Sequence, residues 1–372
     1  MEVVKDKTSG RIESLQILRA FAFLGIFASH CGIASPGIGS WGSSVFFALS
    51  GFLMVYRYLG KDVDCTFKSC LLFSINKVSK LYYLHIITMI ASLMFPVFFH
   101  GSSILEQIAK NYRAIILHIS LLQSWIPQSN YYFSLNGPSW FLSDCLFIYA
   151  VFPLILFLIK KLKTKQQAGI CLIIIYILHL VFGYGLRSIH LLDGFSDNFV
   201  KWAIYINPIY RLGDFIIGGL LGCIYEFECR RCNKDCPSMI QYTILELFSL
   251  FLFIISRMIV TGIITGFFRT WWFMYSGLYI PSNLLFIWVF AFKRGVITRT
   301  IQYKFLHFIG NVSMYAYLIH GIVIGYLQKI WFLVFQNNIT RFYLIVLSLS
   351  VTCILSVLFE KHNKDVLNRI KI

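Results

Sequence analysis

A histidine and an arginine interrupt the first long apolar stretch of the chain. His30 follows Arg19 by eleven residues, which on a helix separates them by ~16 Å. Ionisable groups within hydrocarbon are costly and usually pair or face a polar cavity. A neutral imidazole can take a proton from a hydroxyl and return it, which is general base catalysis. His30 is therefore a candidate proton carrier; the alternatives are a histidine satisfied by a neighbouring helix and, for Arg19, a boundary residue that reaches the interface.

Two lysines precede the third apolar stretch on one helical face. Lys77 and Lys80 are three residues apart, a spacing that makes them neighbours on a helix. Two ammonium groups there can hold the phosphates of a cytoplasmic donor. The alternative is an ordinary pair of positive anchors at the inner end of a span.

Polar groups also occur in later apolar stretches. Asp144 lies near the start of the stretch 139–159 and can orient a histidine or bind an acceptor hydroxyl; the alternative is a carboxylate that faces the positive end of the helix dipole. Ser313, Tyr317 and His320 follow one another at spacings of four and three residues, so they share a helix face. Such a stripe lines either a cavity or a helix contact.

Other polar and small residues are interpreted as structural. Arg211 and Asp214, three apart within a span, are expected to form an internal ion pair. Gly42, Ser50 and Gly51 belong to a small-residue segment that favours close helix packing.

The composition indicates an all-α integral membrane protein. The chain is 58% hydrophobic and only 13% charged, against roughly 25% charged residues in soluble domains. A spanning helix needs about 20 apolar residues, and the sequence predicts a polytopic helical bundle of about ten spans. The expected spans are 15–33, 43–59, 81–99, 139–159, 168–186, 206–226, 242–260, 272–292, 308–332 and 341–359.

The basic residues predict the orientation. The 33 Lys and Arg concentrate in every second connection, and cytoplasmic loops carry such an excess. Both termini are then cytoplasmic, and the segment 104–126 is expected to be interfacial or re-entrant at the outer surface. Residues 1–372 are expected to form one membrane domain without a fused soluble domain. No connection is large enough to build a basic face for nucleic acid.

No metal site is expected. Cys229, Cys232 and Cys236 form the one cysteine cluster, and they lack a fourth zinc ligand. A reduced cytoplasmic loop is the favoured interpretation.

The order of these motifs along residues 11–360 resembles the integral-membrane acyltransferase-3 family, which includes bacterial polysaccharide O-acetyltransferases. The resemblance rests on Arg19 and His30, on the segments 46–52 and 140–153, on a basic pair before the third span, and on the segment 310–320. It implies acyl-CoA, most simply acetyl-CoA, as a donor substrate without a permanently bound cofactor. It also implies a glycan or lipid-linked sugar as the acceptor. The location is inferred from the chain itself: its reduced cysteines, basic cytoplasmic loops and many aromatic residues fit a bacterial inner membrane, although the wider family has eukaryotic relatives.

The resemblance also implies roles for individual residues. His30 is the essential proton-transfer group and Arg19 its charged partner. Lys77 and Lys80 stand where the family usually has arginines, which grip phosphate with a bidentate fork that lysine lacks. Many members carry a glutamate at the position of Cys145; Asp144 is one residue earlier, and one residue turns a side chain by about 100° on a helix.

A transporter or flippase for a polysaccharide or lipid-linked sugar is the rival interpretation. Its buried polar groups would form a substrate path without covalent chemistry. The sequence has no inverted repeat of the kind found in many transporters, which favours the enzyme.

Overall fold

The computed structural model describes residues 12–34, 36–191, 196–231, 238–261 and 277–370. Throughout these ranges the regular structure is helical, and the expected all-α architecture is confirmed. The helices of the N-terminal half are α1 (Leu15–His30), α2 (Pro36–Tyr58), α3 (Phe67–His100), α4 (Ile104–Ile119), η1 (Gln123–Trp125), α5 (Ser129–Tyr132), η2 (Gly137–Ser139) and α6 (Trp140–Lys160). Those of the C-terminal half are α7 (Lys165–Leu191), α8 (Asp197–Lys201), η3 (Trp202–Ile206), α9 (Pro208–Arg231), α10 (Met239–Val260), α11 (Ile280–Phe292), α12 (Val296–Thr300), α13 (Lys304–Phe335) and α14 (Arg341–Ile370).

Seven of the described helices are long and apolar enough to cross a membrane: α2, α3, α6, α7, α10, α13 and α14. The other three expected spans correspond to α1, α9 and α11. Of these, α1 and α11 are shorter apolar helices, and α9 carries the predicted ion pair within its length. The integral membrane character is therefore confirmed, while the count of ten spans and the cytoplasmic termini stay predictions. Cys232 and Cys236, and the residues 272–276 of the eighth expected span, lie outside the described residues.

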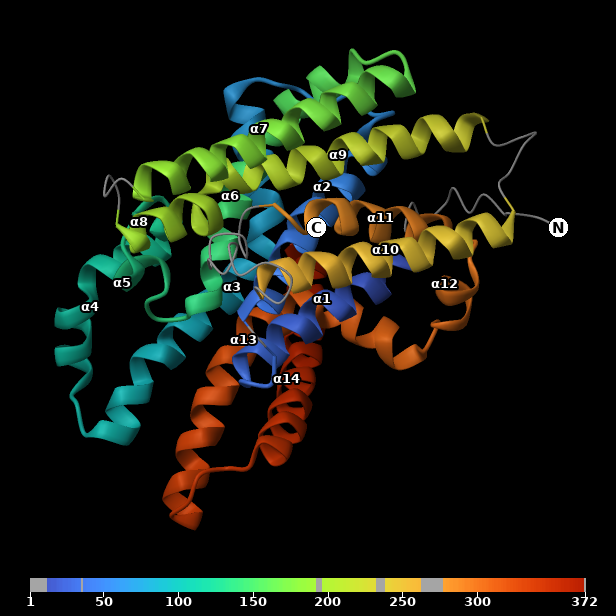
Figure 1. The fold of residues 1–372 in the computed structure, drawn as a ribbon. Coiled ribbons are helices and arrows are strands. Elements are labelled where there is room, and N and C mark those ends of the chain that lie inside the picture. Colours follow the sequence, from blue (N-terminus) through green and yellow to red (C-terminus); the bar gives the residue numbers. More distant parts are fainter. Residues whose placement is uncertain (1–11, 35, 192–195, 232–237, 262–276, 371–372) are drawn as a thin grey trace.

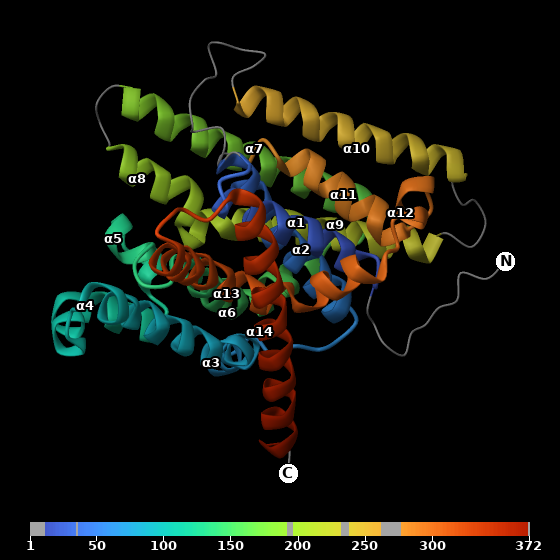
Figure 2. The same ribbon diagram turned by 90° about the horizontal axis from the view of Figure 1, so that it is seen from below.

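Helices α1 and α2 lie at the centre of the bundle, whereas α10 lies at its periphery (Figures 1 and 2). Helix α1 packs against α2, α11 and α13, and α2 packs against α9. Leu15, Ile17 and Phe23 of α1 are completely buried. This central position explains how a helix of only 16 residues can carry ionisable side chains, because its neighbours are protein and not lipid.

Small residues bring α2 and α9 into backbone contact. A Cβ atom on Gly218 of α9 would overlap the carbonyl group of Ala48, and one on Gly51 of α2 would overlap the carbonyl of Phe215. Gly42 meets α1 instead, where a Cβ would lie 2.7 Å from a side-chain carbon of Ile26. The predicted role of the small residues in close packing is thus confirmed, and both α1 and α9 use it.

The segment 104–126 does not form a span. Helix α4 is 16 residues long and buries only Ala114 and His118, so it is shorter than the ~20 residues that cross a bilayer. His118 is the anchor of the segment between α4 and α6, which is expected on the outer side and is called the outer loop below. Its Nδ1 lies 3.2 Å from the Ser139 hydroxyl and its Nε2 lies 3.1 Å from the Ser134 hydroxyl, while its carbonyl oxygen lies 2.9 Å from Nε2 of His85. One buried imidazole therefore holds the loop that precedes α6.

The Gly218 contact predicts a large steric effect of one substitution. In Gly218→Val the new side chain must displace the α2 backbone, because a helix backbone cannot move aside as a side chain can. We expect a loss of about 1–3 kcal/mol or more of stability, seen as a lower unfolding temperature of the detergent-solubilised protein. Gly169→Val in α7 is the matched control, since nothing lies within 4 Å of a Cβ at Gly169. Equal unfolding temperatures for both variants would contradict the packing.

The His118 anchor predicts an acid-sensitive outer loop. Burial, and then the neighbouring His85 ring, lower the pKa of His118 from 6.5 to about 4. Between these values the unfolded chain binds a proton that the folded chain does not, so stability present above pH 6.5 is lost as the pH falls toward 4. We expect amide exchange in residues 120–139, corrected for its intrinsic pH dependence, to be about tenfold faster at about pH 5 than at about pH 7.5. His118→Gln should remove this pH dependence; an unchanged profile in that variant would refute the assignment.

Candidate active site

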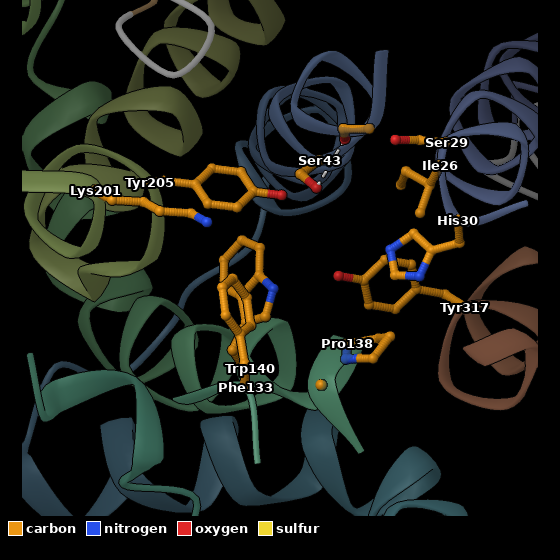
Figure 3. A pocket seen from close by; sticks show the side chains of 12 residues that line it. Ile26, Ser29, His30, Ser43, Phe133, Pro138, Trp140, Lys201, Tyr205 and Tyr317 are labelled. Carbon is orange, nitrogen blue, oxygen red and sulfur yellow. Dashed lines mark hydrogen bonds between the residues drawn. The ribbon is translucent and has the colours of Figure 1, made fainter. Parts of the chain in front are cut away.

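A cavity of about 390 Å³ opens beside the end of α1. It is of the size that holds one small ligand, and it is assembled from six separated parts of the chain (Figure 3). Its walls are mostly apolar and aromatic, with a few polar side chains. The lining residues are Ile26, Ser29 and His30 of α1, Gly39 and Ser43 of α2, Phe133, Gly137 and Pro138 of the outer loop, Trp140 of α6, Lys201 and Tyr205 before α9, and Tyr317 of α13.

His30 is the last residue of α1, and its side chain is exposed to this cavity. Its ring lies edge-on to the ring of His320, with the centroids 4.7 Å apart. The Nδ1 atom of His320 lies 3.2 Å from the carbonyl oxygen of Ala316. A carbonyl only accepts hydrogen bonds, so this nitrogen carries the proton of a neutral His320 ring. His320 is completely buried, and within the described residues its Nε2 has no hydrogen-bond partner.

Tyr317 completes the wall beside His30. Its hydroxyl points into the cavity (Figure 3), and its ring contacts Phe141 at 5.3 Å and His320 at 5.9 Å between centroids. The structure therefore brings together three sequence-predicted residues, His30, Tyr317 and His320. The first two line the cavity, and the third supports the His30 ring from behind.

The opposite wall presents aromatic faces and one cation. The rings of Trp140 and Tyr205 lie 5.1 Å apart, and the ammonium of Lys201 lies 5.2 Å from the centre of the Phe133 ring. In Figure 3, Lys201 and Tyr205 approach the cavity from the side opposite His30. Sequence reasoning assigned no role to any of these residues. One feature of the sequence does set Lys201 apart: it is a lysine in the connection 187–203, which is expected on the outer side and is nearly free of basic residues.

Asp144 and Ser313, both expected on the substrate path, lie outside the cavity lining. Asp144 is completely buried one helical turn beyond Trp140, and within the part of the chain that the structure describes neither of its carboxylate oxygens has a hydrogen-bond partner. The hydroxyl of Ser313 donates to the carbonyl of Gly310 at 2.8 Å, within its own helix. Both residues are buried in contacts between helices. Neither the polar stripe that contains Ser313 nor the position of Asp144 near the start of its helix brings the side chain to the cavity.

Arg19 also lies away from His30, near the other end of α1. Its Nη1 lies 3.5 Å from Oε1 of Gln16, and it lies near Tyr149. Arg19 does not line the cavity. The two residues of the motif therefore occupy different levels of the bundle.

Lys77 and Lys80 lie on the early part of α3, which begins at Phe67 and so continues beyond the expected span. The Nζ of Lys77 donates to the Tyr58 hydroxyl at 2.8 Å and lies 5.2 Å from the centre of the Phe73 ring. The Lys80 side chain is exposed. The pair shares one region of the helix, as predicted, and is separate from the cavity at His30.

The predicted ion pair of α9 is confirmed and supports the cavity wall. Nη1 of Arg211 lies 2.6 Å from Oδ2 of Asp214, and Nε2 of His179 lies 3.3 Å from Oδ1 of the same carboxylate. The guanidinium Nε donates to the carbonyl of Tyr205 at 2.7 Å. Arg211 and Asp214 are buried, so this network fixes the backbone that presents Tyr205 to the cavity.

Comparison with known proteins provides one named relative. The chain is 29% identical over 238 residues to acyltransferase MdmB of Streptomyces mycarofaciens. The similar region covers 58% of this chain and 57% of that protein, so the chain matches a little over half the length of this curated relative. No solved structure matches the chain.

The family assignment rests on a wider match. Residues 12–361 match the profile of the family described as "Acyltransferase domain". This match includes the cavity, the His30 wall and the basic segment of α3, and it extends over nearly the whole membrane domain. The chain therefore belongs to the integral-membrane acyltransferase-3 family.

Proposed function

We propose that this protein transfers an acyl group, most simply acetyl, from cytoplasmic acyl-CoA to a hydroxyl of a surface or lipid-linked glycan. The observation that carries the proposal is the exposed imidazole of His30 in a cavity whose walls are aromatic with a few polar side chains. The acyltransferase family supports the reaction class. The donor and the acceptor are part of the proposal, as are a bacterial inner membrane and cytoplasmic termini.

His30 acts as the general base in this reaction. It takes the proton of the acceptor hydroxyl while the hydroxyl oxygen forms a bond to the thioester carbonyl carbon. The carbon–sulfur bond then breaks, and the proton passes to the leaving thiolate, so that ester and free CoA are the products. The His320 ring packs edge-on against His30 and supports it, and the Tyr317 hydroxyl can donate to the oxygen that develops negative charge.

The donor is held at the other side of the membrane domain. Lys77 and Lys80 bind phosphate groups of CoA at the cytoplasmic end of α3, and the acyl end enters the bundle. Arg19 lies near Tyr149, and we place it along the route of the donor, where its charge can hold a polar group of the CoA chain while the thioester itself reaches His30. Ser313 and Asp144 contribute to packing around this path.

Loss of His30 tests the proposed base. His30→Ala should lower the rate of acyl transfer about 10²–10⁴-fold, with the protein level in the membrane unchanged. His100→Gln is the matched control, because His100 is an exposed histidine of α3 outside the cavity. The measurement is transfer of a labelled acyl group to glycan by membranes that contain each variant. Full activity of His30→Ala would refute the mechanism.

The basic pair is tested by its effect on the donor alone. Lys77→Gln together with Lys80→Gln should raise the KM for acyl-CoA about tenfold, the effect of ~1.4 kcal/mol of lost binding. The KM for the acceptor should stay constant, since neither lysine lines the cavity. Arginine at both positions should retain or improve donor affinity. A changed acceptor KM with constant donor KM would contradict the assignment.

The release of free CoA distinguishes the proposed acyltransferase from a flippase or transporter. Vesicles that contain the protein should release free CoA when acyl-CoA and an acceptor glycan are both present, and the acceptor should gain an acyl group that mild base removes. Transport of an unmodified glycan without release of CoA would favour the rival function.

A further inference from the structure

Lys201 is the cation on the cavity wall opposite His30 (Figure 3). It is the last residue of α8, and the chain continues directly into η3. Tyr205 follows it by four residues and faces the same cavity. Val200 and Ile204, on the other side of this helical segment, are completely buried. Trp202 fixes the segment further, since its indole Nε1 donates to the carbonyl of Ser124 at 2.8 Å.

No ion pair is formed between Lys201 and the carboxylates whose side chains the structure describes, a set that does not include Asp197. Among the described side chains, the contact that its ammonium makes is with the Phe133 ring. Lys201 is half-buried, and burial lowers its pKa from 10.5. A partly desolvated cation without an anion is unfavourable. An anionic group in the cavity would restore the missing pair.

The rest of the cavity suits a sugar ring between Lys201 and His30. The faces of Trp140, Phe133 and Tyr205 are apolar surfaces with a polar rim, and Ser29 and Ser43 offer hydroxyl groups. A volume of about 390 Å³ holds a small ligand rather than a polymer segment. A hydroxyl at His30 and an anionic group at Lys201 therefore belong to one sugar or to two adjacent ones.

We propose that the acceptor is an acidic glycan unit, whose carboxylate or phosphate pairs with Lys201 while its hydroxyl meets His30. This inference rests on the proposed function. It makes Lys201 a residue that determines acceptor specificity, separate from the donor-binding lysines of α3. The same cation disfavours an acceptor that carries an amine at this position.

The test compares three acceptors that differ in one substituent: a neutral oligosaccharide, its carboxylate form and its phosphate form. The protein is reconstituted in vesicles of zwitterionic lipid, and acylation is measured with acetyl-CoA. The wild type should show about a tenfold lower KM for the carboxylate or the phosphate form than for the neutral form. The better of the two identifies the anion.

Lys201→Met should raise the KM for the preferred acidic acceptor about tenfold relative to that for the neutral form, so that the preference for acid is lost. Lys201→Arg should retain the preference. Lys110→Met, which removes an exposed lysine of α4 outside the cavity, is the matched control. Lys201→Glu with an amine-bearing acceptor should reverse the preference, which excludes a mere folding defect. The inference would be overturned if the wild type used the neutral and acidic forms equally, in the same way as Lys201→Met.

Binding separates this inference from the proposed function. The acidic oligosaccharide should raise the unfolding temperature of the wild type more than that of Lys201→Met. If no acceptor is acylated but this difference persists, the proposed function fails and the anion site stands. If acylation occurs without any preference for acid, the proposed function stands and the anion site fails.

Discussion

The buried pair of Arg211 and Asp214 is the constraint around which this side of the bundle is built. The charge of a guanidinium in the interior must be balanced by an anion. Asp214 provides that charge, the Tyr205 carbonyl accepts from Nε of Arg211, and His179 of α7 lies against the same carboxylate. These two residues of α9 thus connect it to η3 and to α7. The aromatic wall of the cavity is positioned by electrostatics as well as by apolar packing.

The helical membrane architecture was predictable because long apolar stretches record it directly. His30 and Tyr317 could also be identified, since polar groups within apolar helices are rare and few in number. The position of Ser313 outside the cavity lining has a geometric cause. Periodicity shows that residues share a face, but only the packed structure shows which part of that face meets the cavity. Lys201 and Trp140 were missed because cations and aromatic residues are common at membrane surfaces. Their role arises from residues brought together across long sequence distances.

The two ionisable residues of α1 divide the helix between two environments. His30 ends the helix at the cavity, while Arg19 lies inside the bundle near Tyr149. A sequence motif that looks like one catalytic pair therefore separates its two residues by about three helical turns. Since α1 is enclosed by α2, α11 and α13, the spacing between its two ends cannot change without repacking the centre of the protein. Under the proposed function, α1 sets a fixed distance between the donor site and the acceptor site.

The turn between α8 and α9 is π-helical over Trp202–Ile206, and the amide of Asn207 bonds to the carbonyl of Trp202 at 2.8 Å. A π turn contains one residue more than an α turn. Five π-helical residues turn through about the same angle as four α-helical residues, so one residue could be lost here with little change in the direction of Lys201 relative to α9. The π turn therefore accommodates one additional residue in the wall beside the cavity without turning Lys201 away from it.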